Sequence, residues 1–289
     1  MKYNRKLIYS ILLALFLCAI ILFLALSLNA RKNGLQIVFL NVGQGDAILI
    51  SQGSTQTLID GGKDGKLILE KLARYVPFWD RTIENVILTH PDQDHLGGLI
   101  EVAKTYQIKT VLETADRNDS QADKYWEQLI SEKNIEKIDA KKGVTLKFPQ
   151  GGEMKVLYPI ESINDQSKED TNSTSVITKL EYGSNKFLFT GDFPTAVDKT
   201  LFESGQNLAA DVLKISHHGS KYATSEEFLE KTNPKVAIIS VGKNNSYGHP
   251  SVEVLQRLRT HGIEILRTDE MGDIVYECEN EKTVCSLSR

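Results

Sequence analysis

Residues 89–98 of the chain read THPDQDHLGG, directly after the apolar run VIL at positions 86–88. Two imidazoles and two carboxylates fall within six residues: His90, Asp92, Asp94 and His95. A solvated loop with a capping aspartate rarely carries two histidines at this density. Imidazole and carboxylate together suit Zn²⁺, Mn²⁺ or Fe²⁺, and more carboxylates shift the preference toward Mn²⁺ or Mg²⁺. The spacing predicts a metal-binding loop at the end of a buried strand.

Further polar residues follow other apolar, strand-like runs. They are Asp60 after QTLI, Asp192 after FLFTG, His217 and His218 after DVLKIS, and His249 in the loop NNSYGHPS. Because such strands are buried, polar residues at their tips can emerge at a common sheet edge and form a ligand platform. Taken singly, Asp192 fits a turn or a helix N-cap, which is the commoner role of a Gly-Asp pair, and a buried core position is the alternative for the histidines after DVLKIS. Adjacent histidines point to opposite sides, so either His217 or His218 can be a ligand.

The N-terminal segment is apolar enough to cross a membrane. From Leu7 to Leu28 only Tyr, Ser and Cys residues interrupt the apolar run, and this length spans a bilayer. The run ends in LSLNARKNG, without the small residues of a cleavage site, so we predict an uncleaved anchor, with a cleaved signal peptide as the alternative. The basic residues on both sides slightly favour a cytoplasmic N-terminus, which places the bulk of the chain outside.

The cysteines agree with an external location. Cys278 and Cys285 flank the predicted hairpin YECENEKTVCSL, whose strands can set the two sulfurs opposite each other. A cross-strand disulfide forms in an oxidising compartment and is rare in the cytosol, and a reduced pair is the alternative. Cys18, within the apolar run, is interpreted as an apolar filler.

Charge excludes a broadly basic nucleic-acid-binding surface. Five of the 34 basic residues and none of the 38 acidic ones lie in the first 32 positions, so the rest of the chain carries a net charge of −9. Lysines and arginines are scattered, and the dense run 132–142 mixes both signs. Binding of a polyanion therefore requires a local site or a metal.

Beyond residue 34 short β-rich runs alternate with helical patterns. Strands are expected at 35–42, 47–51, 56–60, 85–90, 109–112, 144–148, 153–158, 175–183, 185–192, 211–216, 235–242, 264–268 and 273–279. Helices are expected at 64–76, 99–107, 123–133, 193–205, 225–233 and 252–262, with Gly97 and Gly98 forming a steep turn before the second of these. Residues 162–174 are the best loop candidate. Two halves of this kind predict two mixed sheets face to face with helices outside.

In this order the motifs resemble the metallo-β-lactamase superfamily, in particular the hydrolase domain of ComEC-type competence proteins. The matching stretches are FLNVGQGDAILI, LIDGG, LTHPDQDHLGGL, NSTSVITKL, FLFTGD, DVLKISHHGS, NNSYGHPS and RTDEMGDI, which together cover nearly all of residues 35–278. The resemblance implies a four-layer αββα sandwich, preceded here by one transmembrane helix. Residues 1–32 would then be a membrane anchor with a short cytoplasmic tail, and residues 33–289 the hydrolase domain.

The resemblance also implies a site for two divalent metal ions, Zn²⁺ or Mn²⁺. The implied metal ligands are His90, Asp92, Asp94, His95, Asp192 and either His217 or His218, with Asp192 as the bridge. Asp60 would support the metal loop by hydrogen bonds. Hydrolysis would proceed through a hydroxide held between the ions and oriented by Asp94, with His249 or His218 protonating the leaving oxygen or holding a phosphoryl oxygen.

Two positions depart from the common superfamily pattern. The superfamily usually has histidine where this chain has Asp92, and a further ligand histidine near Asn172, which can offer only a weak carbonyl ligand or a hydrogen bond to substrate. Both changes are usual in the ComEC-like branch. They shift the preference of the first metal site toward a harder ion.

The expected function is a membrane-anchored, outward-facing phosphodiesterase or nuclease, with DNA as one candidate substrate. No counterpart of the multi-span ComEC channel is present in these 289 residues, so we expect a stand-alone hydrolase. The alternatives are an esterase for a choline-type cell-envelope phosphodiester, with Tyr222 and Tyr247 caging the quaternary ammonium, and a non-catalytic, metal-stabilised binding module.

Overall fold

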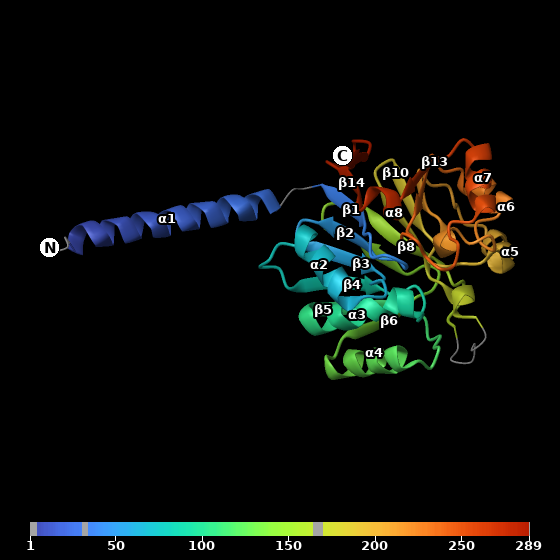
Figure 1. Ribbon diagram of the computed structural model, residues 1–289, viewed down its shortest axis with the longest axis horizontal. Coiled ribbons are helices and arrows are strands. Elements are labelled where there is room, and N and C mark those ends of the chain that lie inside the picture. The colour runs from blue at the N-terminus through green and yellow to red at the C-terminus, as the bar shows by residue number, and fades with distance from the viewer. Residues whose placement is uncertain (1–4, 31–33, 164–169, 289) are drawn as a thin grey trace.

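The computed structural model describes residues 5–30, 34–163 and 170–288. Two mixed β-sheets pack face to face, and helices cover their outer surfaces (Figure 1). This is the four-layer architecture expected from the sequence. Part of the predicted loop at 162–174, and the basic residues Arg31 and Lys32 after the apolar run, lie outside the described residues.

The first sheet has eight strands in the order β15-β14-β1-β2-β3-β4-β5-β6. They are β1 (Leu35–Phe39), β2 (Ile48–Gln52), β3 (Thr55–Ile59), β4 (Thr82–Ile87), β5 (Gln107–Glu113), β6 (Glu136–Asp139), β14 (Ile274–Cys278) and β15 (Ser286–Ser288). Strands β3 to β6 are parallel, and the others pair antiparallel. The short edge strand β6 was not predicted, because it has no apolar run, whereas β15 corresponds to the second strand of the hairpin predicted at 276–287.

The second sheet has seven strands in the order β13-β12-β11-β10-β9-β8-β7. They are β7 (Thr145–Lys147), β8 (Glu153–Tyr158), β9 (Ile177–Tyr182), β10 (Asn185–Phe189), β11 (Val212–Lys214), β12 (Val236–Ile239) and β13 (Glu264–Arg267). Strands β10 to β13 are parallel, as in the inner part of the first sheet. In both sheets the carboxyl ends of the parallel strands therefore share one edge.

The outer layers are helical. The helices are α2 (Gly65–Tyr75), α3 (Gln93–Thr105), α4 (Gln121–Glu132), α5 (Asp198–Glu203), α6 (Glu226–Thr232), α7 (Val252–Thr260) and α8 (Thr268–Met271), with 3-10 turns η1 (Thr171–Thr174), η2 (Thr195–Val197) and η3 (Ser216–Gly219). Asp64 caps α2 by accepting from the N–H groups of Lys66 and Leu67, and α2 ends before Pro77 as predicted. The helix predicted at 193–205 is divided between η2 and α5.

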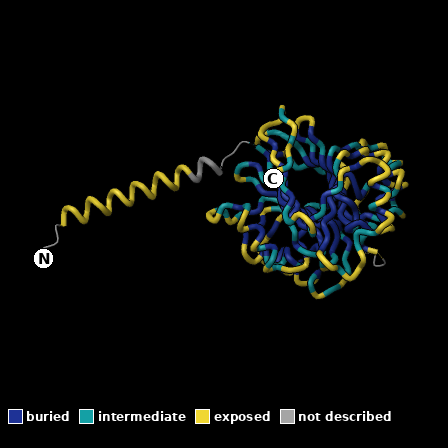
Figure 2. The backbone as a smooth tube through the Cα atoms, turned by 45° about the horizontal axis from the view of Figure 1, so that its top comes forward, coloured by how far each residue is buried: buried dark blue, intermediate teal, exposed yellow. Residues whose placement is uncertain are grey.

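Three apolar cores hold the layers together. One lies between the sheets and includes Phe39, Phe187 and Phe189. The second packs the first sheet against helices that include α2, α3 and α4, and the third packs the second sheet against α5, α6 and α7. Figure 2 shows buried backbone through the middle of the sandwich and exposed backbone around it. Burial of so many side chains fixes the strand ends that present the polar residues.

The two glycines after the metal loop correct one expectation. Gly97 and Gly98 lie inside α3, which already begins at Gln93, so they do not form a turn. A Cβ on Gly98 would lie 2.0 Å from the carbonyl oxygen of Gly61, and one on Gly97 would lie 2.6 Å from that of Lys63. The glycines therefore let α3 approach the 61–63 segment closely.

Helix α1 (Arg5–Ala30) projects from the sandwich, and its described side chains are exposed (Figures 1 and 2). Within the described residues it is the one helix long and apolar enough to cross a membrane, over Arg5–Ala25, and a signal sequence would share these features. Only positions 31–34 separate it from β1.

Candidate metal centre

Three segments that are distant in the sequence, at residues 90–95, 192 and 218, meet at the carboxyl edge of the two sheets. His90 follows β4, His95 lies in the first turns of α3, Asp192 follows β10, and His218 lies in η3 after β11. His95 Nε2 is 3.4 Å from Asp192 Oδ1, and His218 Nε2 is 3.4 Å from Asp192 Oδ2. Asp94 Oδ2 lies 3.3 Å from His218 Nε2. These residues, predicted from the strand ends, are brought together.

The second ring nitrogen of each buried histidine is held by the protein. His95 Nδ1 lies 2.8 Å from Asp60 Oδ2, and His218 Nδ1 lies 2.9 Å from the carbonyl oxygen of Ser240. The Thr89 hydroxyl donates to Asp60 Oδ2, so it can accept from His90 Nδ1, 3.0 Å away. A ring that donates through Nδ1 keeps a lone pair on Nε2. The protein therefore orients three imidazole lone pairs.

Among the described residues the convergent atoms have no hydrogen-bond partner, although buried polar atoms are nearly always hydrogen-bonded. The buried atoms without a partner at this site are His90 Nε2, His95 Nε2, His218 Nε2 and Asp192 Oδ1. Ligand atoms of His90, His95 and Asp192 lie within 4.8 Å of one another, and so do those of Asp94, His95 and His218. Two overlapping donor sets of imidazole and carboxylate fit divalent cations.

The buried carboxylates of the centre favour the binding of a positively charged group. Burial alone would lower the pKa of His218, but the carboxylates of Asp192, Asp46 and Asp94 outweigh it and raise the pKa to about 9. Burial would raise the pKa of Asp192, but His218 and His95 hold it well below its usual value. The carboxylates thus keep their negative charge in the interior, where a cation can neutralise it.

Asp92 and Asn172 lie at the border of the centre. Asp92 Oδ1 accepts from the Thr171 hydroxyl at 2.7 Å, and its Oδ2 is 3.8 Å from His90 Nε2. Asp92 is therefore near His90 but outside the groups whose ligand atoms lie within 4.8 Å of one another. The Asn172 Oδ1 atom is buried and has no hydrogen-bond partner within residues 5–30, 34–163 and 170–288.

His217 and His249 lie at the more open side of the centre. The His217 side chain is 33% exposed, and its Nε2 is 3.7 Å from Asp192 Oδ2. The His249 ring lies 5.8 Å from that of His217 and 6.0 Å from that of Tyr247. Burial, and then the rings of His217 and His218, lower the pKa of His249, which keeps it neutral near pH 7.

The sequence reasoning missed one buried pair behind the centre. Lys214 Nζ lies 2.5 Å from Asp46 Oδ2, and both side chains are almost fully buried. Asp46 Oδ1 is 3.5 Å from His218 Nδ1. The positive charge of Lys214 compensates the negative charge of Asp46 in the interior. The Asp46 carboxylate can therefore remain ionised beside the His218 ring. The signals were a charged residue inside the apolar run DVLKIS and the aspartate that ends GQGD.

A family model described as the metallo-beta-lactamase superfamily matches residues 40–243, well over half of the chain. The chain belongs to this superfamily. Its fold resembles that of the metallo-beta-lactamase fold protein YhfI from Bacillus subtilis, with a TM-score of 0.56 and 14% identity over 84% of this chain and 99% of that one. Zn(2+)-bound PqqB from Methylobacterium extorquens gives a TM-score of 0.51 at 14% identity, over 78% and 85% of the two chains.

This superfamily member is related to competence proteins. It is 31% identical to ComE operon protein 3 of Bacillus subtilis (strain 168), over 91% of this chain and 36% of the relative. It is 27% identical to Competence protein ComA of Neisseria gonorrhoeae, over 85% of this chain and 32% of the relative. The chain thus spans about a third of the length of these relatives. The expected family and fold are confirmed.

Proposed function

We propose that the chain is a metal-dependent phosphodiesterase or nuclease, anchored by an uncleaved α1 with residues 33–289 outside the membrane. The observation that carries the proposal is the convergence of four unpartnered buried atoms, on His90, His95, His218 and Asp192. Such an arrangement is expensive to maintain without a ligand, because each unpaired buried group costs about 1–3 kcal/mol. A pair of bound cations would satisfy all four atoms.

In this proposal Asp192 would contribute to both metal sites, because its two oxygens face different imidazoles. His90 and His95 would hold one ion, and Asp94 and His218 the other. Bound divalent cations supply Lewis acidity to a phosphoryl oxygen and acidify a water molecule. Asp94, whose side chain is 28% exposed, can accept a proton from a water held at the mouth of the centre.

His249 and His217 would position the substrate. A neutral imidazole can donate one hydrogen bond, and His249 Nδ1 has no partner in the protein. We propose that His249 holds a phosphoryl oxygen, with His217 beside it. Asn172 offers a further polar atom at the opposite border.

An external location is supported by the disulfide. Cys278 and Cys285 are bonded in the structure, which is the first of the two alternatives that the sequence left open. Disulfides persist in oxidising compartments outside the cytosol. The relation to competence proteins makes DNA a substrate to test, although the net charge of −4 for the whole chain indicates that affinity must come from the metal centre.

The choline-type alternative gains no specific support. Lys221 Nζ lies 4.9 Å above the ring of Tyr222, so this aromatic face already holds a cation. Tyr247 is stacked near His249 and offers one exposed face. A single tyrosine is a poor cage for a quaternary ammonium.

The test is hydrolysis by the full chain, purified in detergent, stripped with chelator and reloaded with Mn²⁺ or Zn²⁺. Substrates are bis-p-nitrophenyl phosphate, single-stranded DNA and nitrocefin. We expect turnover of the first two alone, and loss of metal and activity in His218→Asn and Asp192→Ala. His261→Asn and Asp139→Ala are matched controls, since both residues lie on the exposed surface. Bound metal without turnover of any substrate would instead support a binding module.

A further inference from the structure

An aromatic pair lies exposed at the end of the sandwich opposite the metal centre. Phe78 is 74% exposed and Trp79 is 38% exposed, in the segment between α2 and β4. Their rings pack edge to face at 4.8 Å, so they form one apolar projection. Large adjacent aromatic side chains on a surface mark a contact with another apolar phase or partner.

This projection is continuous with the apolar helix. The ring of Phe23 in α1 lies 6.0 Å from the ring of Trp79. Positions 31–34, between α1 and β1, span at most about 14 Å when fully extended. The first residue of β1, Leu35, pairs with Gln52, and Thr55 of the next turn lies at the same end of the sheet. The helix and the aromatic pair therefore stay at one end of the domain.

The position of Phe23 in α1 indicates the depth at which Trp79 would lie relative to the bilayer. Phe23 lies in the last two turns of the apolar run, which extends from Leu7 to Leu28. Aromatic residues at the ends of a span lie at the height of the lipid headgroups, where one side of the ring is apolar and the other meets water. A tryptophan in contact with Phe23 lies at that height as well.

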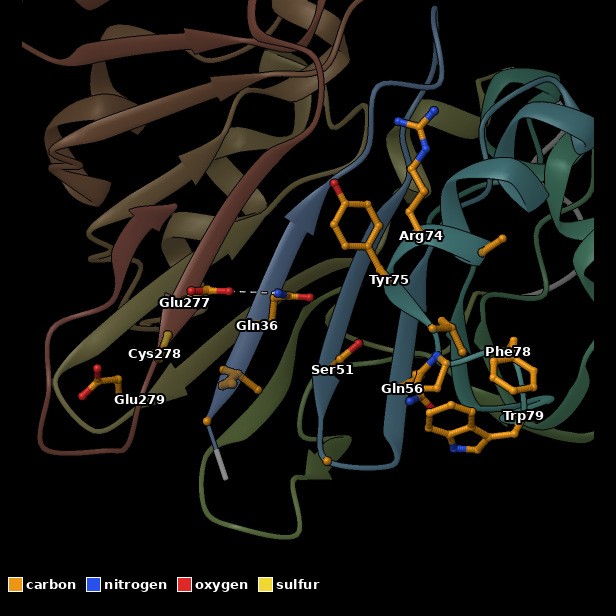
Figure 3. A pocket seen from close by; sticks show the side chains of 16 residues that line it. Gln36, Ser51, Gln56, Arg74, Tyr75, Phe78, Trp79, Glu277, Cys278 and Glu279 are labelled. Carbon is orange, nitrogen blue, oxygen red and sulfur yellow. Dashed lines mark hydrogen bonds between the residues drawn. The ribbon is translucent and has the colours of Figure 1, made fainter. Parts of the chain in front are cut away.

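The surface between the Phe78–Trp79 pair and β1 also has a composition that matches the headgroup region of a bilayer. A cavity of about 750 Å³ lies there, lined by apolar and aromatic groups together with polar ones, among them Gln36, Ser51, Arg74 and Glu277 (Figure 3). Figure 3 shows Phe78 and Trp79 at one side of this cavity and the start of β1 at the other. Mixed polar and apolar walls match the headgroup region of a bilayer.

We propose that Phe78 and Trp79 insert into the interfacial layer of the phospholipid bilayer that α1 spans. The inference rests on the proposal that α1 is an uncleaved anchor. It adds a second, peripheral contact that fixes the orientation of the catalytic domain on the membrane. The site then lies at the far end of the six-residue strand β4 from this contact.

The chain contains two tryptophans, and this allows a direct test. Trp126 is fully buried and reports the interior, whereas Trp79 reports the proposed contact. The full chain is reconstituted into vesicles of phosphatidylcholine, with and without bromine on the acyl chains near the headgroup. Bromine quenches tryptophan only at contact range. We expect loss of emission for the wild type and no loss for Trp79→Phe, in which Trp126 alone emits.

Tyr247→Trp in the Trp79→Phe background is the matched control, because it carries an exposed ring at the metal-centre end. We expect its emission to be unquenched. Equal quenching of the wild type and Trp79→Phe, or quenching of the Tyr247→Trp control, would overturn the inference. Flotation of the vesicles separates the two proposals. A chain that fails to float refutes the anchor, whereas one that floats without quenching of Trp79 refutes only the aromatic contact.

Discussion

The imidazoles of the centre differ in how the protein holds them. His95 and His218 are each fixed through Nδ1 by a carboxylate or carbonyl oxygen, and their Nε2 atoms point at Asp192. His217 has no such support and is a third exposed. Buried support on the distal nitrogen is the usual mark of a ligand, because it sets the tautomer and the ring orientation. Of the adjacent pair, His218 is therefore the better ligand.

Substitution of His249 distinguishes a role in substrate binding from a role in metal binding. His249→Ala is expected to lower kcat/KM for bis-p-nitrophenyl phosphate roughly 10- to 100-fold, because one hydrogen bond to a charged oxygen contributes about 1.5–3 kcal/mol. Most of the effect should fall on KM. Metal content, measured by plasma emission, should stay at the wild-type value. A variant with normal KM would exclude contact with the substrate.

The buried ion pair of Lys214 and Asp46, behind His218, leads to a prediction about the free energy of unfolding. Lys214→Met leaves Asp46 charged and unpaired in the interior, which costs about 3–5 kcal/mol. Chemical denaturation of the variant measures this loss. The double variant Lys214→Met, Asp46→Asn removes the unpaired charge and should recover part of it. If the double variant were no more stable than the single one, the cost would come from packing.

Residues after buried strands were predictable because each apolar run ended in one unusual polar residue. His90, Asp192 and His218 all met this condition, and the fold brings them together. The orientation of the His217 and His218 side chains was harder to predict, since alternation along a strand does not say which of two adjacent histidines faces inward. Asp46 and Lys214 are separated by more than half of the chain, and only the packing of the sheets pairs them.

At the scale of the helices and strands, the close approach of α3 to the 61–63 segment depends on Gly98. In an ordinary helix interior Gly98→Ala would stabilise by about 1 kcal/mol. Here the added Cβ would lie 2.0 Å from the Gly61 carbonyl oxygen, so we expect a loss of about 1–3 kcal/mol. Ser131→Ala, on the exposed side of α4, is the control and should be neutral. Denaturant midpoints measure both, and a more stable Gly98→Ala would refute the close contact.

The hairpin of β14 and β15 supplies a second prediction at this scale. The disulfide closes a loop with a separation of 7 residues, and such a loop is worth about 2–3 kcal/mol in a chain-entropy estimate. The double variant Cys278→Ala, Cys285→Ala should unfold at lower denaturant by that amount, whereas Cys18→Ala should not. In intact cells, alkylation of the pair should require prior reduction. Free thiols without a reductant would place the domain in a reducing compartment.

For the whole molecule, ligand binding should appear as stability. Mn²⁺ or Zn²⁺ at about 100 times its dissociation constant stabilises the native state by about 2.7 kcal/mol. For a domain of this size the melting temperature should rise by roughly 5–10 °C. Scanning fluorimetry measures the shift, chelator should reverse it, and Asp192→Ala should lack it. A shift that survives in Asp192→Ala would indicate that the ion binds elsewhere.

The layered architecture was predictable as a whole because short apolar strands alternate with amphipathic helices in both halves. The edge strand β6 was not, since it is short and polar and forms only by pairing with β5. The beginning of α3 was also misplaced. Its first turn carries the proposed ligands Asp94 and His95, and apolar spacing alone places the helix after them.

Strand β4 joins the two ends of the domain, with the aromatic pair before it and His90 after it. Six residues at about 3.3 Å each separate these ends by about 20 Å. Headgroups of the supporting bilayer would then stay out of reach of the hydrolytic centre, while a long water-soluble strand could pass across the outer face. Under the proposed function, this arrangement would protect the cell's own phospholipids and leave the centre free to hydrolyse material arriving from the medium.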